Sequence, residues 1–319
     1  MTTQNSYQSN LYQPEGFRLG TAENTEGVSN LAALERAMAS GRILESVVLM
    51  CDKNFTLTLD LGGIRGIIRR DQCAYLPEGE PLKDIAVISR VGKPVCFKVI
   101  GFEKDDNGRP LAVLSRRAAQ SDCMYNFLMK LTAGDIVPAR VTHLEPFGAF
   151  VDIGCGVVSL MSIDCISVSR ISHTRDRFAP GMNIRAVIKT IDYETGRIFT
   201  THKELLGTWE ENVEMFNIGQ TVTGIVRSIE EYGVFVELAA NLAGLAERRE
   251  GLEIGQGVAV FIKNIIPDRM KVKLVLIDNY HGECAPRPME YFIPADCLRI
   301  DSWRYSPEDS GKVIESSFT

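Results

Sequence analysis

Two short segments of the sequence each carry a pair of aromatic residues three positions apart, with a glycine after the first. The segments are Phe147-Gly148-Ala149-Phe150 and Tyr232-Gly233-Val234-Phe235. An aromatic ring held on a protein surface can stack on another flat ring, and each stacked nucleobase contributes about 1–3 kcal/mol. A glycine inside a strand pattern is typical of a bulge or a close bend, which would turn the first ring toward the face of the second. These residue types therefore predict ring stacking.

The residues after each pair predict which way the rings point. Alternate residues of a strand face opposite sides, so Val151 points inward if Asp152 points outward, which places Phe150 on the outer face. The same alternation places Phe235 outward beside Glu237. The alternative is that a linker helix or a neighbouring structural unit covers these rings, and the alternation alone leaves both possibilities open.

The aromatic pairs belong to a longer internal repeat. Residues 134–153 align without a gap with residues 219–238, at an offset of 85 residues. A glycine followed three residues later by Val or Ile also opens an apolar run at Gly92, Gly181 and Gly255. Self-similarity of this kind defines the structural unit before any motif is considered, and it indicates a third, earlier copy.

The three repeat units are predicted to span residues 42–118, 132–206 and 217–278. Each contains short β-branched or apolar runs separated by Gly, Asn and Asp, and lacks the helical stretches that a parallel sheet requires. Five short strands in a unit of this size favour a small closed barrel, which removes exposed sheet edges. The predicted fold is mainly β, with three tandem five-stranded barrels.

The segments outside the barrels follow other patterns. Residues 119–131 and 207–216 carry apolar residues at helical spacing, so we expect short helices to join one barrel to the next. Residues 1–41 are predicted to form a polar, mobile arm and a short helix over 28–39. Residues 279–319 form an aromatic-rich C-terminal extension that we expect to pack against the last barrel.

Composition sets limits on the class of protein. The chain has 319 residues, 45% of them hydrophobic, and a formal net charge of -6. The net charge is +3 in residues 42–118, 0 in 132–206 and −1 in 217–278, so most of the acidic excess lies outside the predicted barrels. No apolar run is long enough for a membrane span, and the first residues lack a secretion signal. These features favour a cytoplasmic protein without a membrane partner.

Catalytic and metal-binding patterns are missing from the sequence. The eight cysteines include no Cys-x-x-Cys pair, and His281 with Cys284 supplies only half of a metal site. The four histidines are widely spaced. The sequence contains no Gly-x-Ser-x-Gly turn of a serine nucleophile, no Gly-x-x-x-x-Gly-Lys loop that binds phosphate and no His-Glu-x-x-His helix that binds zinc. We therefore expect no enzyme activity, no metal and no cofactor.

The second unit resembles the S1 RNA-binding domain, a barrel of the oligonucleotide-binding fold. The resemblance rests on residues 147–153, the leading glycine and valine pattern of residues 134–141, and the closing Asp192-x-x-x-Gly196-Arg197. In that family single-stranded RNA crosses the barrel on two aromatic residues of strand two, a histidine, an aspartate and an arginine. The resemblance implies these site residues in the second unit: Phe147, Phe150, Ser162 in the histidine position, Asp192 and Arg197.

The resemblance is good for the third unit and weak for the first. In the third unit it implies Tyr232 and Phe235, while Glu247 stands in the histidine position and four cations can offset its charge: Arg248, Arg249, Arg269 and Lys271. In the first unit Phe55 matches the first ring, Thr58 replaces the second, and Arg69 takes the histidine position. The basic residues of the first unit favour either phosphate contacts or an ordinary solvated face.

Two functions follow from these features as expectations. The first is a non-enzymatic protein that binds single-stranded RNA by base stacking and phosphate contacts, in translation or RNA metabolism. The second is a protein-docking or scaffold factor for the ribosome or an RNA-processing enzyme, with weak RNA affinity. The substituted histidine positions and the incomplete first unit motivate the second expectation.

Overall fold

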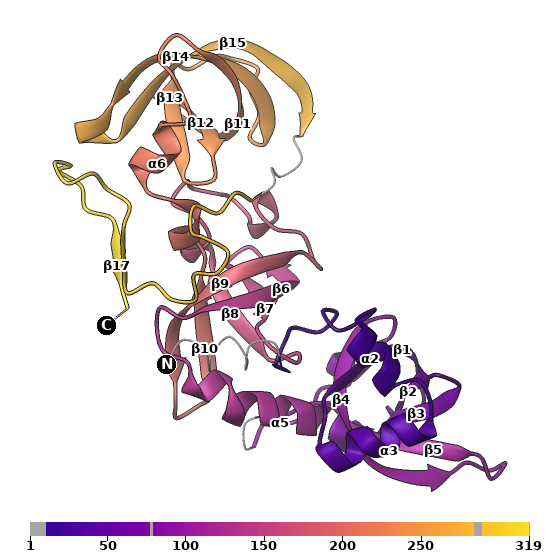
Figure 1. Cartoon of the computed structure of the whole chain (residues 1–319). Helices are drawn as coiled ribbons and strands as arrows, with labels where there is room; N and C mark the ends of the chain where they lie inside the picture. Colours follow the sequence, from indigo (N-terminus) through magenta and orange to yellow (C-terminus); the bar gives the residue numbers. More distant parts are fainter. Residues whose placement is uncertain (1–10, 77–78, 284–288, 319) are drawn as a thin grey trace.

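A computed structural model describes residues 11–76, 79–283 and 289–318 of the chain. It contains three closed five-stranded β-barrels and one two-stranded sheet. Figure 1 shows the three barrels following one another, with the helix α5 (Arg116–Asn126) between the first and the second. The predicted mainly β fold of three tandem barrels with short helical linkers is confirmed.

The first barrel follows two short helices, α2 (Ala22–Gly27) and α3 (Leu31–Ser40). Its strands pair in the order β1-β2-β3-β5-β4. Leu57, Leu59 and Leu61 alternate with polar residues and are fully buried, as the alternation of the sequence predicts. The elements are β1 (Leu44–Cys51), β2 (Leu57–Leu61), β3 (Ile64–Ile68), a short helix α4 (Asp84–Ile88), β4 (Pro94–Lys104) and β5 (Pro110–Ser115).

The second barrel repeats this topology, and a parallel contact between its third and fifth strands closes it. Val141, Ala149 and Val151 line its interior, together with residues of α5 such as Cys123. Its strands are β6 (Ile136–Glu145), β7 (Gly148–Asp152), β8 (Val158–Ser162), β9 (Asn183–Asp192) and β10 (Arg197–Thr201).

The third barrel follows α6 (Trp209–Val213), whose Trp209 is buried in the core of this barrel. The two longest of its strands pair with each other. The strands are β11 (Thr221–Glu230), β12 (Gly233–Ala239), β13 (Leu242–Ala246), β14 (Gln256–Ile266) and β15 (Lys271–Glu283).

Residues 289–318 form a C-terminal strap that includes the small sheet of β16 (Ser302–Arg304) and β17 (Glu315–Ser317). Trp303 and Tyr305 pack into the core of the third barrel, whereas Phe318 packs beside Ile136 of the second. The segment packs against the last barrel, as expected, and it also lies against the second barrel, which the sequence did not indicate.

Residues 11–19 run between the first and second barrels. Tyr12 stacks on Phe127 with ring centroids 5.8 Å apart, and Glu15 is buried against Arg116 of α5. The expectation of a free polar arm is wrong for this part of the N-terminal segment, since its carboxylate and backbone groups find partners in both barrels. Residues 1–10 lie outside the described residues.

Candidate nucleic-acid interface

The first aromatic pair lies on the outer face of the second barrel. Phe147 is 56% exposed and Phe150 is half-buried, and their rings meet edge to face at 6.1 Å and 88°. Gly148 allows β7 to approach β8 closely, because a Cβ atom at this position would lie 2.6 Å from the carbonyl oxygen of Met161. Neither a linker helix nor a neighbouring barrel covers Phe147.

The second pair repeats this geometry on the third barrel. Tyr232 is 70% exposed, and its ring meets that of Phe235 edge to face at 6.2 Å and 88°. Gly233 has a φ of +154°, and a Cβ atom there would lie 2.5 Å from the carbonyl oxygen of Ala246. The same packing constraint therefore builds the same ring pair twice.

The structure adds two residues to the face of the second barrel that the sequence analysis did not single out. Pairing of neighbouring strands places His143, Phe150, Leu160 and Phe199 in one row across the barrel. His143 is exposed, and its ring lies 6.1 Å from that of Phe150. Phe199 is 37% exposed, and its position follows from alternation with the buried Ile198.

His143 reaches the outer face because the strand contains a bulge. Val141 points inward, so a strict two-residue period would also turn His143 inward, but the register of β6 against β7 shifts between these residues. The equivalent shifts occur between Val48 and Met50 and between Val226 and Ser228. The repeated shift belongs to the barrel architecture, and alternation alone does not reveal it.

The matching row on the third barrel is more cationic. It contains Ser228, Phe235, Leu245 and Lys273, so a lysine stands where the second barrel has Phe199. Four of the predicted site residues are also exposed on this barrel: Arg248, Arg249, Arg269 and Lys271. This face combines two aromatic rings with exposed positive charge.

The other predicted residues of the second barrel occupy different environments. Arg197 is exposed and lies 3.3 Å from Glu80 of the first barrel. The Asp192 carboxylate accepts hydrogen bonds from the hydroxyl and backbone N–H of Thr195, and these bonds hold its pKa below the usual value. Ser162 donates to the thiol of Cys165. Arg197 therefore presents a charged group to solvent, whereas Asp192 stabilises a turn.

The first barrel carries no equivalent ring pair. Phe55 is half-buried, and the guanidinium of Arg70 lies over its ring at 4.5 Å. Arg69 bonds Glu103 at 2.8 Å. Thr58 occupies the position of Phe150 and is 9% exposed.

The two acids beside the ring pairs do not face water. Asp152 is 2% exposed at the joint between the first two barrels, and Glu237 is 4% exposed at the joint between the second and third. The expectation that both point outward with Phe150 and Phe235 fails because neighbouring segments cover them. Burial raises the pKa of Asp152, and the nearby charge of Glu15 raises it further.

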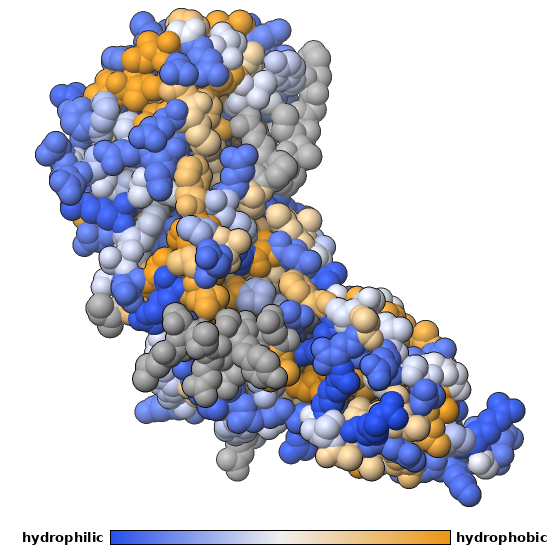
Figure 2. All heavy atoms as spheres, viewed as in Figure 1, coloured by the Kyte–Doolittle hydropathy of each residue, from blue (hydrophilic) through white to orange (hydrophobic). Residues whose placement is uncertain are grey.

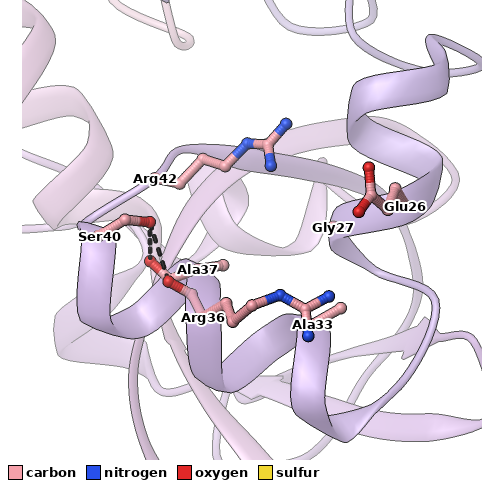
Figure 3. Close-up of a pocket in the computed structure, with 7 residues that line it drawn as sticks. All are labelled: Glu26, Gly27, Ala33, Arg36, Ala37, Ser40 and Arg42. Carbon is pink, nitrogen blue, oxygen red and sulfur yellow. Dashed lines mark hydrogen bonds between the residues drawn. The ribbon is translucent and has the colours of Figure 1, made fainter.

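A separate pocket of about 230 Å³ lies against α2 and α3. Figure 3 shows Arg36, Arg42 and Glu26 along it, with the Ser40 hydroxyl donating to backbone carbonyls of α3. Arg42 already pairs with Glu23 at 2.6 Å. No aromatic ring lines this pocket, which distinguishes it from the faces of the second and third barrels.

Metal-binding clusters and membrane-spanning helices are both absent from the described part of the chain. Within residues 11–76, 79–283 and 289–318, no group of three or more His, Cys, Asp and Glu side chains could hold a metal ion. No helix in those ranges is both long and apolar enough to cross a membrane. Cys284, one residue of the possible half-site, lies outside the described residues.

Comparison with known proteins agrees with this geometry. The family model of the S1 RNA-binding domain matches residues 130–203, which include the whole second barrel. The second barrel is therefore an S1-like domain. The sequence resemblance carried by residues 134–197 is thereby confirmed.

Similar curated proteins cover most of the chain. The small ribosomal subunit protein bS1 of Rickettsia conorii is 26% identical over 296 residues, which make up 85% of this chain and 50% of that protein. The protein of the same name from Staphylococcus aureus (strain MRSA252) is 29% identical over 297 residues, or 88% of this chain and 71% of that protein. The chain thus spans about half of the length of the Rickettsia relative.

Among solved structures, a multidomain protein with nucleic acid binding domains from Streptococcus pneumoniae shares 15% sequence identity. The match covers 74% of this chain and 73% of that chain with a TM-score of 0.24.

Proposed function

We propose that this protein binds single-stranded RNA on the outer faces of its second and third barrels and acts in translation or RNA metabolism. The observation that carries the proposal is the pair of matching ring arrangements, Phe147 with Phe150 and Tyr232 with Phe235, each open to solvent at its first ring. The S1 family match and the ribosomal names of the relatives support an RNA ligand and a ribosomal partner.

Stacking explains the preference for a single strand. In a duplex the faces of the bases are covered by their neighbours, whereas an unpaired base can be splayed onto an aromatic ring. Cations around each ring pair then contact the phosphates, in a way that does not depend on sequence and weakens with salt. On this model Arg197, Arg248, Arg249, Arg269 and Lys271 contact the backbone, while the rings supply the base contacts.

Alanine substitution of the ring pairs tests the mechanism. Phe147→Ala/Phe150→Ala and Tyr232→Ala/Phe235→Ala should each weaken binding of labelled single-stranded RNA by at least about 10-fold, since each lost base stack costs about 1–3 kcal/mol. Titrations at several salt concentrations should show this loss at every concentration, because stacking does not depend on charge.

The matched control is Tyr125→Ala, which removes an aromatic ring that is 60% exposed on α5 and belongs to no ring pair on a barrel face. Its affinity should equal that of the wild type. Unchanged affinity for single-stranded RNA in both double variants would contradict the stacking mechanism.

A docking function is the second candidate, and it rests on the first barrel. This barrel exposes apolar side chains, with Leu49 58%, Met50 51% and Ile85 67% exposed, and it has no ring pair. Such side chains favour contact with a protein surface over contact with phosphates. A ribosome contact that survives nuclease treatment while RNA affinity stays weak would favour this candidate.

A further inference from the structure

One buried residue connects four segments at the joint between the second and third barrels. Asn241 lies in the turn between β12 and β13 and is 1% exposed. Its side-chain oxygen accepts from the N–H of Val168 at 2.8 Å, and its amide donates to the carbonyls of Lys203 and Gly207 at 2.9 and 3.0 Å. The Tyr305 hydroxyl of the C-terminal strap donates to the backbone carbonyl of Asn241. The second barrel, the linker, the third barrel and the strap therefore meet at this residue.

A buried charge cluster lies at the same joint. Glu237 of the third barrel accepts from both terminal nitrogens of Arg177, which belongs to the second barrel, at 2.8 and 2.5 Å. Arg227 of the third barrel also donates to Glu237, at 2.7 Å, and pairs with Asp176 at 3.0 Å. Separating the barrels would leave these charges buried without partners or force them into water, so the cluster opposes movement at the joint.

The C-terminal strap is attached to the second barrel by backbone and side-chain contacts. The N–H of Ile300 donates to the carbonyl of Gly134 at 2.9 Å, and the N–H of Ile136 donates to that of Leu298 at 2.8 Å. The guanidinium of Arg185 donates to three strap carbonyls, those of Ile293, Pro294 and Cys297. These contacts fix one part of the strap on the second barrel.

The same strap is anchored on the third barrel. Trp303 is 8% and Tyr305 is 5% exposed, and both pack into the core of that barrel. The N–H of Trp209 donates to the carbonyl of Tyr305 at 2.9 Å. In Figure 1 the strap, drawn in yellow, runs from beside the third barrel down to the second. A segment anchored on both barrels in this way prevents them from rotating independently.

We propose that Asn241 and the C-terminal strap make the second and third barrels one rigid RNA-binding unit, in which the two ring pairs are held at a fixed separation. The proposal rests on the proposed RNA binding and deepens it. If the two barrels were joined by a flexible tether, RNAs over a broad range of lengths could contact both ring pairs. With a rigid joint, only an RNA long enough to span the fixed separation can contact both pairs and gain affinity. Arg185, Asn241 and Tyr305 are then positioning residues that determine the RNA length required.

Affinity measured against RNA length tests this. The wild type should bind oligouridylates of increasing length, from about 6 to about 30 nucleotides, with an abrupt gain in affinity at one length, because one barrel of this fold occupies about 4–16 nucleotides. Arg185→Ala/Tyr305→Phe should reduce the affinity for the longest RNA by about 10-fold or more and replace the abrupt gain by a gradual one. Its affinity for the shortest RNA should stay within about 2-fold of the wild type, because both ring pairs are intact.

The matched control is Lys312→Ala, which changes an exposed side chain of the same strap and should keep the abrupt gain. A distance measurement without RNA separates this proposal from the proposed function. Dyes attached through unnatural amino acids at the exposed positions Glu194 and Glu250 should give a narrow distance distribution in the wild type and a broad one in Arg185→Ala/Tyr305→Phe.

A broad distribution in the wild type would overturn the rigid unit while leaving RNA binding intact. An abrupt gain that survives in the double variant would overturn the role of Arg185 and Tyr305 as positioning residues. A narrow distance distribution in the wild type together with no affinity for RNA of any length would instead overturn the proposed function. It would also overturn the role of the joint in RNA binding.

Discussion

At the scale of single residues, equivalent positions of the three barrels carry different chemistry on the same scaffold. The outer position of the fifth strand holds Val113 in the first barrel, Phe199 in the second and Lys273 in the third. In the same row, the second strand holds an aromatic ring in the last two barrels and Thr58 in the first, with one third-strand residue between it and the fifth strand. The second barrel therefore favours stacking, and the third adds charge to its ring pair.

The cations of the third barrel lead to a prediction about salt. For single strands the slope of log affinity against log salt is about −0.7 per phosphate contact, so Lys271→Ala/Lys273→Ala should reduce its magnitude by about 1.4. The measurement is an RNA titration between low and moderate salt. Lys53→Ala, an exposed lysine in the first barrel, is the control and should keep the wild-type slope. If the double variant also kept that slope, these lysines would make no phosphate contact.

At the scale of elements, the joint between β10 and the C-terminal strap contains a buried histidine. The Nδ1 atom of His202 lies 3.2 Å from the carbonyl oxygen of Ile166, and Nε2 lies 3.2 Å from the hydroxyl of Tyr291. Phe178 packs edge to face against the imidazole at 5.2 Å. Burial lowers the pKa of His202 to about 4, from an ordinary value of 6.5, because the charged ring would lose its hydration.

This shift predicts how the free energy of unfolding depends on pH. Between pH 6.5 and 4 the unfolded chain binds a proton at His202 and the folded chain does not, so stability falls as the pH is lowered through this window. The contribution lost between pH 7 and pH 5 is about 2 kcal/mol. His202→Gln should therefore lose less stability than the wild type over that range.

The measurement is urea unfolding at pH 7 and pH 5, followed by the fluorescence of Trp209 and Trp303, the two tryptophans of the chain. His143→Gln changes an exposed histidine and should follow the wild-type pH dependence. Equal losses in the wild type and His202→Gln would show that His202 does not titrate differently on unfolding.

At the scale of the whole molecule, contacts fix both joints between the three barrels. At the first joint Glu15 accepts from Arg116 at 2.6 and 2.9 Å, and its N–H donates to Asp152 at 2.7 Å. Figure 2 shows hydrophilic and hydrophobic residues side by side on the visible faces of all three barrels. Arg116 with Glu15 at the first joint, and Arg177 with Glu237 at the second, are buried instead.

Removing one partner of the first joint should release the first barrel. Arg116→Ala removes the nearer of the two cations beside the buried Glu15, leaving Arg90 at 3.7 Å, and breaking a buried ion pair typically costs about 3–5 kcal/mol. We expect a lower melting temperature and a larger maximum dimension in small-angle X-ray scattering. Arg117→Ala, the exposed neighbour, should match the wild type in both measurements. A wild-type scattering profile for Arg116→Ala would show that other contacts hold the joint.

The sequence by itself determined the repeated unit and the ring pairs. Alternation of Leu57, Leu59 and Leu61 predicts a half-buried strand, and the gapless repeat predicts a second and third copy of the same barrel. Phe150 and Phe235 could be assigned to an outer face because hydrophobic periodicity is a local property, which neighbouring residues along the chain already express.

Only the tertiary structure decided what surrounds those faces. Asp152 and Glu237 look like solvated surface acids in the sequence, and they become buried because a segment distant along the chain folds over each of them. His143 points outward because a bulge, formed by pairing with another strand, interrupts the two-residue period. The strap's attachment to two barrels depends on contacts such as Tyr305 with Asn241, 64 residues apart in the chain. Local patterns express the preferences of neighbouring residues, and contacts between distant residues appear only when the chain is folded.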